Sequence, residues 1–137
     1  NHTYVDHIAP NCNSSENYKG IIDDKATAVF NGKVMVQPDA QKINAFQSNQ
    51  NILLSDDATI NSKPELEIYA DDVLCSHGST TGQLDEEAVF YLRTRGVSEI
   101  SAKKMMIRAF VFEVLEEIKL ESFRTHIEDL IDEKFKV

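Results

Sequence analysis

A cysteine and a histidine two residues apart are the side chains whose types and spacing best suit chemistry in this chain. They are Cys75 and His77, in the string Cys75-Ser76-His77-Gly78. In an extended segment, residues two apart face the same side, so the thiolate and the imidazole would be presented together. This pair of donors suits iron, iron-sulfur species or zinc.

Two donors are too few for a closed metal site. Tetrahedral zinc sites and iron-sulfur clusters take about four protein ligands, and the chain has no second Cys-His cluster. The remaining donors would have to come from another chain or from solvent. The alternative is a buried small thiol beside a hydrogen-bonded histidine at a strand end, which the residue types alone favour over a ligand pair.

The other histidines and the second cysteine are scattered. His2, His7 and Cys12 follow one another at intervals of five residues, which places successive members on opposite faces of a strand. Ordinary strand and loop positions are therefore expected for them, in preference to a metal site.

Signatures of the common enzyme classes are missing from the sequence. It contains no Gly-rich phosphate loop, no Gly-x-Ser-x-Gly elbow, no His-Glu-x-x-His and no Cys-x-x-Cys. A hydrolase acting on polysaccharide is an alternative, because acidic residues are plentiful. Glycoside chemistry needs two carboxylates at a fixed distance on one face, whereas the Asp-Asp pairs at 23–24, 56–57 and 71–72 are sequential neighbours typical of turns. A protein without enzymatic activity is expected.

Length and charge limit the architecture and the partners. The chain has 137 residues, which allows one domain or a small domain with an appendage. Its 14 basic and 23 acidic residues give a net charge of −9, and a field of that sign repels nucleic-acid phosphates.

No apolar stretch approaches the roughly 20 residues of a membrane span. We expect a soluble, cytoplasmic protein that binds neither nucleic acid nor membrane, with both cysteines reduced. The chain lacks an initiator methionine, which suggests an excised fragment.

The residues before Leu84 have the pattern of short strands separated by turns. Strand-like runs at 26–30 and 33–36 flank Asn31-Gly32, a strong hairpin-turn signal. The Asp-Asp pairs precede three of the runs, which hints at the stacked turns of a coiled sheet, and a sandwich is the alternative.

After Leu84 the pattern becomes helical. Asp85 is a suitable N-cap for a first helix, and Gly96 a suitable stop.

Two further amphipathic helices are predicted. One begins near Ser98 or Ser101 and ends near Leu120, and Ser122 would cap the other. The expected apolar stripe of the first helix is Ala88, Tyr91 and Leu92; that of the second is Ala102, Met105, Met106, Ala109, Phe110 and Val114; that of the third is Phe123, Ile127, Leu130 and Ile131.

A long segment of the chain resembles a known family. Residues 64–96, PELEIYADDVLCSHGSTTGQLDEEAVFYLRTRG, are similar to the C-terminal core of the SufB/SufD family, and the segments 29–36, 40–42 and 102–113 fit the same pattern. The string Cys-Ser-His-Gly before Gln-Leu-Asp-Glu-Glu looks like the SufD form of the family. The sequence departs from that form at 79–81, where Ser-Thr-Thr stands in place of the frequent Ala-Thr-Val.

The resemblance implies a fold and a role. The implied fold is mainly β with α: a right-handed parallel β-helix, a solenoid, over residues 1–84, followed by a C-terminal helical subdomain over 85–137. The implied role is that of a non-enzymatic scaffold subunit for iron-sulfur cluster assembly, which pairs with a SufB-like subunit and docks the SufC ATPase, an ABC-type protein. A purely structural interaction module that binds no metal is the alternative.

The resemblance also assigns residues. His77 matches the family histidine at the SufB interface that is linked to cluster assembly, and Cys75 matches the cysteine beside it. Since the family places SufC contacts in the helical subdomain, the ATPase dock is expected on an adaptable apolar surface formed by Met105, Met106, Phe110 and Phe112. Arg95 is expected to anchor the helices through a carboxylate. The chain alone is expected to bind no cofactor, with a transient cluster at the heteromeric interface. In isolation it is expected to associate with itself as a homodimer.

Overall fold

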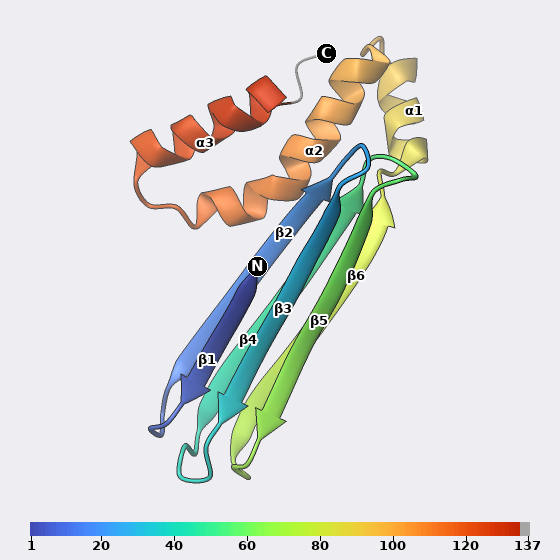
Figure 1. The fold of residues 1–137 in the computed structure, drawn as a ribbon. Helices are drawn as coiled ribbons and strands as arrows, with labels where there is room; N and C mark the ends of the chain where they lie inside the picture. Colours follow the sequence, from blue (N-terminus) through green and yellow to red (C-terminus); the bar gives the residue numbers. More distant parts are fainter. Residues whose placement is uncertain (135–137) are drawn as a thin grey trace. The chain divides into compact units, whose positions relative to one another are not determined.

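The computed structural model describes residues 1–134 and divides the chain into two compact units. The β unit, Asn1–Gly82, is built from strands, and the helical unit, from Gln83 onward, from helices. Strands β1 to β6 precede helices α1 to α3 along the chain (Figure 1). The protein is therefore mainly β with α, as predicted.

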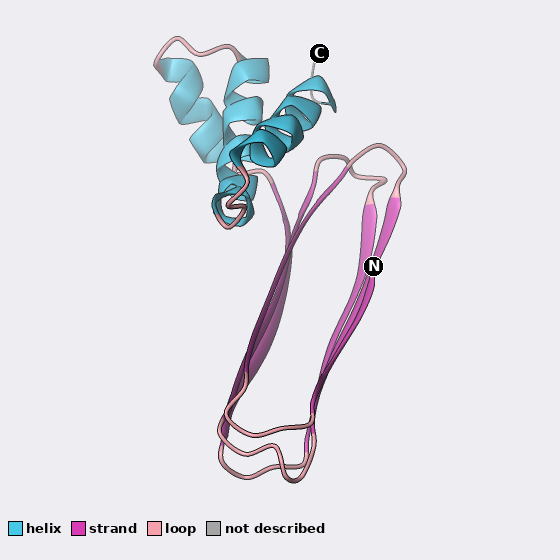
Figure 2. Ribbon diagram, turned by 90° about the vertical axis from the view of Figure 1, so that its left-hand side faces the viewer, coloured by secondary structure: helices cyan, strands magenta, loops and turns pink. Residues whose placement is uncertain are grey.

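The strands of the β unit form two separate three-stranded sheets. Sheet A contains β1 (His2–His7), β3 (Thr27–Val36) and β5 (Thr59–Ile68), in the order β1-β3-β5. Sheet B contains β2 (Asn13–Ile22), β4 (Ile43–Leu53) and β6 (Val73–Gln83), in the order β2-β4-β6. Figures 1 and 2 show the sheets as two facing layers, with the strands of one running opposite to those of the other. Successive strands thus alternate between the sheets, and each circuit of the chain adds one strand to each sheet.

Neighbouring strands pair in parallel with a register that keeps like faces together. β2 pairs with β4 from Asn13↔Asn44 to Ile22↔Leu53, and β1 and β5 flank β3 in parallel. Because side chains alternate between the faces of a strand, every second residue points between the sheets. The inward residues at one end form an apolar core of Val34, Val36, Ala40, Ile43, Ala45 and Ala70.

Toward the other end, the inward side chains of β4 are polar. Gln47, Asn49 and Asn51 are 3%, 3% and 4% exposed. The Asn51 Nδ2 donates to Asn49 Oδ1 at 2.8 Å, and the Ser62 hydroxyl of β5 donates to the same oxygen at 2.7 Å. Hydrogen bonds of this kind offset the desolvation of the buried amides, which is why polar residues can follow apolar ones along the same inner face.

The predicted turn at Asn31-Gly32 is wrong, because both residues lie inside β3. Gly32 does not adopt the left-handed conformation that such a turn requires. Its small size has another use: a Cβ there would lie 2.5 Å from the Nε2 atom of Gln47, on the facing sheet. Glycine at this position makes room for a buried amide.

The three Asp-Asp pairs lie in the turns between strands, as predicted. Residues 23–24 connect β2 to β3, residues 56–57 connect β4 to β5, and residues 71–72 connect β5 to β6. Asp24 has a φ of 54°, a left-handed conformation that aspartate tolerates better than most residues. These carboxylates lie in turns, and the turns at 23–24 and 56–57 contact each other through Ser55 and the Asp24 carbonyl oxygen.

The helical unit contains α1 (Glu86–Thr94), α2 (Glu99–Glu116) and α3 (Glu121–Lys134). The Asp85 carboxylate accepts hydrogen bonds from two backbone N–H groups of the first turn of α1, which confirms the predicted N-cap. Ser98 caps α2 in the same way. Gly96, with a φ of 89°, follows the end of α1. None of the helices described between residues 1 and 134 combines the length and apolarity that crossing a membrane requires.

The predicted helix faces need correction. α2 buries Ala102, Ile107, Val111 and Leu115. Of the predicted stripe, only Ala102 is buried, and Met105 is 49% exposed. α1 buries Val89, whereas the predicted Tyr91 is exposed. α3 begins at Glu121, so Ser122 lies within it and is not its cap, and no side chain of its described residues is buried. Apolar residues occupy two sides of these helices, and only one of the two sides is buried by packing.

Candidate functional site

Cys75 and His77 both lie on β6, the outer strand of sheet B. β6 pairs with β4 on one side, and within residues 1–134 no strand of sheet B lies beyond it. Two residues apart on a strand, the two side chains share a face. Sulfur and imidazole ligands are therefore presented together at the edge of a sheet.

The thiol of Cys75 is partly buried. Its side chain packs against the apolar core that contains Val34 and Ala45. Burial raises the pKa of the Cys75 thiol above its ordinary value, and a hydrogen bond with the Ala45 backbone opposes that rise. Since the thiolate is the form that binds metals and attacks electrophiles, Cys75 is a weaker ligand and nucleophile at neutral pH than a free cysteine.

The imidazole of His77 is exposed. The next residue, Gly78, faces the other side of the strand, and no atom lies within 4 Å of the place where its Cβ would be. Within residues 1–134, no group of three or more His, Cys, Asp or Glu side chains converges on a point where a metal ion could be held. A ligand set that includes His77 would therefore take donors from another chain or from solvent.

The other candidate ligands of the β unit lie apart from β6 in the fold. His7 is 6% exposed, and its Nε2 lies 2.9 Å from the Ser14 hydroxyl. The Cys12 thiol lies 3.7 Å from the Pro10 carbonyl oxygen. Both side chains make local contacts at the connection between β1 and β2.

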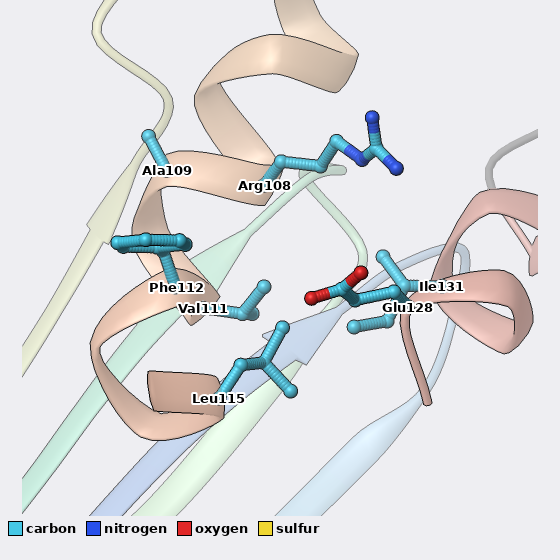
Figure 3. A pocket seen from close by; sticks show the side chains of 7 residues that line it. All are labelled: Arg108, Ala109, Val111, Phe112, Leu115, Glu128 and Ile131. Atoms are coloured by element: carbon cyan, nitrogen blue, oxygen red, sulfur yellow. The ribbon is translucent and has the colours of Figure 1, made fainter. Parts of the chain in front are cut away.

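A second candidate surface lies on α2. Met105 and Phe112 are exposed, at 49% and 55%, and Met106 and Phe110 are half-buried. Between α2 and α3 is a hollow of about 330 Å³. Figure 3 shows the side chains that line it: Arg108, Ala109, Val111, Phe112, Leu115, Glu128 and Ile131. Of the four predicted docking residues, Phe112 lines this hollow.

Arg95 forms the C-cap of α1. Its Nη2 donates to the Tyr91 hydroxyl at 3.1 Å, and its guanidinium carbon lies 5.2 Å from the centre of the Tyr91 ring. The adjacent Arg93 forms an ion pair with Glu99 at the start of α2, at 3.3 Å. The arginines at the end of α1 thus make contacts within the helical unit.

The sequence analysis missed the buried polar residues of β4. The signal was available in the segment 43–51, INAFQSNQN, where every second residue is first apolar and then an amide. Alternation of this kind marks the buried face of a strand. Burial of these amides was not predicted, because Gln and Asn are mostly surface residues.

The sequence of this chain is similar to those of known proteins. Residues 1–110 match a family described as "SUF system FeS cluster assembly, SufBD core domain". The iron-sulfur cluster assembly protein SufD of Escherichia coli is 42% identical over 125 residues, which cover 91% of this chain and 30% of that protein. An iron-sulfur cluster assembly SufBD family protein of Synechocystis is 45% identical over 122 residues, or 89% of this chain and 27% of that protein. The chain thus spans less than a third of the length of these relatives.

Proposed function

Because this chain belongs to the SufBD family of the SUF iron-sulfur system, we propose that it works as a non-enzymatic scaffold subunit of a cytoplasmic complex that assembles iron-sulfur clusters. Its relatives are named iron-sulfur cluster assembly proteins, and one of them is SufD. The cluster is the cargo of such a complex and not a resident cofactor of this chain.

One observation carries the proposal: His77 is exposed on the outer strand of a sheet, with Cys75 beside it on the same face. A sheet edge offers unpaired backbone N–H and C=O groups to a second chain. Docking there would bring foreign ligands next to the imidazole. We assign this edge to a SufB-like subunit, with a transient cluster forming where the two chains meet. In its absence, a second copy of this chain would occupy the edge and form a homodimer.

The alternation of strands between two parallel sheets supports a right-handed parallel β-helix in the complete protein. Each circuit of the chain would then be one turn of the solenoid. Turns of a solenoid contact only their neighbours, so the last turn presents a face that is free to bind. β6 would lie on that face.

The helical unit would dock the ABC-type ATPase. Exposed apolar side chains on α2 and a hollow bounded by α3 support this assignment. Methionine and phenylalanine adapt to a partner's surface at low energetic cost, and an apolar patch bordered by Arg108 and Glu128 has the composition of a protein interface.

Reconstitution of clusters on the purified heteromer tests the role of His77. We expect His77→Ala to reduce the iron and sulfide bound and the visible absorbance sharply, while folding stays within about 0.5 kcal/mol of wild type, because an exposed side chain contributes little to stability. Cys75→Ala should have a smaller effect on the cluster yield. The isolated chain should purify without colour.

A matched control removes another exposed strand histidine. His2→Ala takes an imidazole from β1, where its Nδ1 lies 3.1 Å from the Asn31 amide nitrogen. This variant should assemble clusters normally. A His77→Ala heteromer with the wild-type rate and yield would contradict the proposal and favour an interaction module that binds no metal.

The ATPase dock has a separate test. A charged residue at an exposed apolar contact disrupts binding, so Phe112→Glu should weaken binding of the ATPase in a pull-down with the full-length protein. Ile100→Glu is the control, because Ile100 is equally exposed, at 53%, on α2 but does not line the hollow. Equal binding by both variants would place the dock elsewhere.

A further inference from the structure

Two polar side chains on the inner face of sheet B form a hydrogen-bonded pair next to β6. Glu16 of β2 and Gln47 of β4 are partners in the parallel register. The Gln47 Nε2 donates to Glu16 Oε2 at 2.8 Å. Gln47 is 3% exposed and Glu16 is half-buried, so this charge-assisted hydrogen bond is partly buried.

The pair fixes the direction of the amide. An ionised carboxylate only accepts hydrogen bonds, so Glu16 must face the NH₂ group of Gln47 and not its oxygen. The Gln47 Oε1 is buried and pairs with no donor within residues 1–134. A buried acceptor left unpaired costs about 1–3 kcal/mol, which makes this oxygen a strong site for a donor. The amide has room because Gly32 faces it without a Cβ.

His77 lies beside Gln47 on the neighbouring strand. The Cys75 side chain packs on the inner core, and the Ser79 hydroxyl donates to Ser62 Oγ of β5. Between the segments of β4 and β6, the Lys42 N–H donates to the Asp72 carbonyl oxygen, and the Asn51 Nδ2 donates to the Thr80 carbonyl oxygen at 3.3 Å. Because both Cys75 and Ser79 face inward, alternation places the Cβ of His77 on the inner face between them. A register that pairs Lys42 with Asp72 and brings Asn51 next to Thr80 places His77 opposite Gln47.

We propose that Gln47 is a positioning residue for His77. Its Oε1 accepts a hydrogen bond from one ring nitrogen of His77, and Glu16 keeps the amide turned so that the oxygen faces β6. The exposed ring reaches the amide by rotation about its side-chain torsions, since adjacent strands are only about 4.8 Å apart. The bond fixes the tautomer and leaves the lone pair of the other ring nitrogen available to a ligand brought by a partner.

This inference rests on the proposed function of His77 but makes a claim of its own. Histidines that bind metals generally donate their second ring nitrogen to a protein oxygen, and loss of that oxygen typically costs 10- to 100-fold in metal affinity or activity. With His77 opposite Gln47, the row Glu16–Gln47–His77 would cross all three strands of sheet B. It extends the site from the exposed edge into the interior of the β unit.

The tautomer of His77 provides a test that does not depend on activity. In full-length protein labelled with ¹⁵N-histidine, the ring ¹⁵N shifts report which nitrogen carries the proton, and the His77→Ala variant identifies the signals. We expect one tautomer in the wild type and a mixture of both in Gln47→Met, which keeps the volume and loses the acceptor. Glu16→Gln should give a partial mixture, because its amide no longer dictates the orientation of Gln47.

The matched control is Asn51→Leu, which removes another buried amide from the same face of β4. It should destabilise the fold similarly and leave the single tautomer of His77 unchanged. An unchanged tautomer in both Gln47→Met and Glu16→Gln would overturn the positioning role, even if His77→Ala abolished cluster formation.

Cluster assembly on the heteromer then separates the two proposals. If both hold, Gln47→Met lowers the initial rate of cluster formation about 10- to 100-fold. A mixed tautomer together with a wild-type rate in both Gln47→Met and His77→Ala would support the positioning of His77 and refute its role in assembly.

Discussion

The β unit and the helical unit bury their apolar side chains to very different degrees. In the β unit, Val34, Val36 and Ile43 are no more than 1% exposed. In the helical unit, the described part of α3 has no buried side chain, and Phe123 and Leu130 are each about half exposed. Apolar surface removed from water stabilises by about 25 cal/mol per Å². The core strands β3 and β4 therefore provide stabilisation within the β unit, whereas α3 holds apolar surface that a partner could still cover.

The same contrast separates the two kinds of function proposed for the chain. The β unit provides fixed positions, where sheet register determines which side chain lies beside which. The helical unit provides an adaptable surface, where exposed phenylalanine and methionine can repack. Rigid elements suit the placement of metal ligands, and mobile apolar side chains suit docking.

The largest effect should come from a cavity in the β unit. Ile43 is 1% exposed, and Ile43→Ala should lower the free energy of unfolding by about 2–5 kcal/mol in urea titrations. Ile8→Ala is the control, because Ile8 is 72% exposed and its loss should stay within about 0.5 kcal/mol. Similar losses in the two variants would mean that the core of the β unit is less consolidated than its burial indicates.

A smaller effect is expected from the cap of α1. Asp85→Ala removes the acceptor for two backbone N–H groups and should cost about 0.5–2 kcal/mol, read from faster amide exchange in α1. Asp85→Asn should retain most of the protection, because asparagine caps almost as well. If amide exchange in the β unit became faster by as much as in α1, the loss of the cap would destabilise both units together. That result would contradict the idea that the two units are stabilised separately.

Cys75 should make stability depend on alkaline pH. Its pKa is raised by burial, so the unfolded chain loses the thiol proton at a lower pH than the folded chain. The stabilisation is complete below the ordinary cysteine pKa of about 8.5 and is lost as pH rises through the folded-state pKa. Urea midpoints measured from pH 7.5 to 10.5 should fall more steeply for wild type than for Cys75→Ala. Parallel curves of urea midpoint against pH for wild type and Cys75→Ala would show that burial does not perturb the pKa of this thiol. Cys12→Ala is the control, because it retains Cys75.

The smallest effect is expected for Arg95→Lys in the helical unit. Lysine keeps the charge but lacks the planar group that lies over Tyr91, a contact worth about 0.5–1 kcal/mol at exposed sites. The melting temperature of Arg95→Lys should fall slightly. Tyr91→Phe keeps the ring, so its melting temperature should fall less than that of Tyr91→Ala. A large loss in Arg95→Lys would instead support an anchoring role through a carboxylate.

Local signals in the sequence predicted the elements better than their partners. The change from strands to helices near Leu84 and the N-cap Asp85 depend on neighbours within a few residues, and the structure has both. The turn at Asn31-Gly32 failed because the reason for Gly32 is Gln47, which lies on the other sheet. No local rule includes a contact of that kind.

The helix faces and the site show the same limit. α2 has apolar residues on two sides, so periodicity could not decide between Met105 and Ile107 as the buried one. The pairing of Cys75 with His77 followed from alternation alone, whereas the proposed contact with Gln47 depends on how β4 and β6 pair within sheet B. Spacing can identify a pair of ligands, but only the register identifies what lies behind them.

The parallel register also has a consequence for the speed of folding. Partners in sheet B are residues such as Asn13 and Asn44, and in sheet A residues such as Val34 and Leu66, so no pair of adjacent strands in a sheet can form as a local hairpin. Each pairing must first close a long loop, and chains dominated by such distant contacts fold slowly. Once two circuits have met, they form a template onto which the next strand can add, as in repeat proteins. The last strand to be made, β6, would join such a template last, so we expect it to be the strand of sheet B that stays open longest during folding.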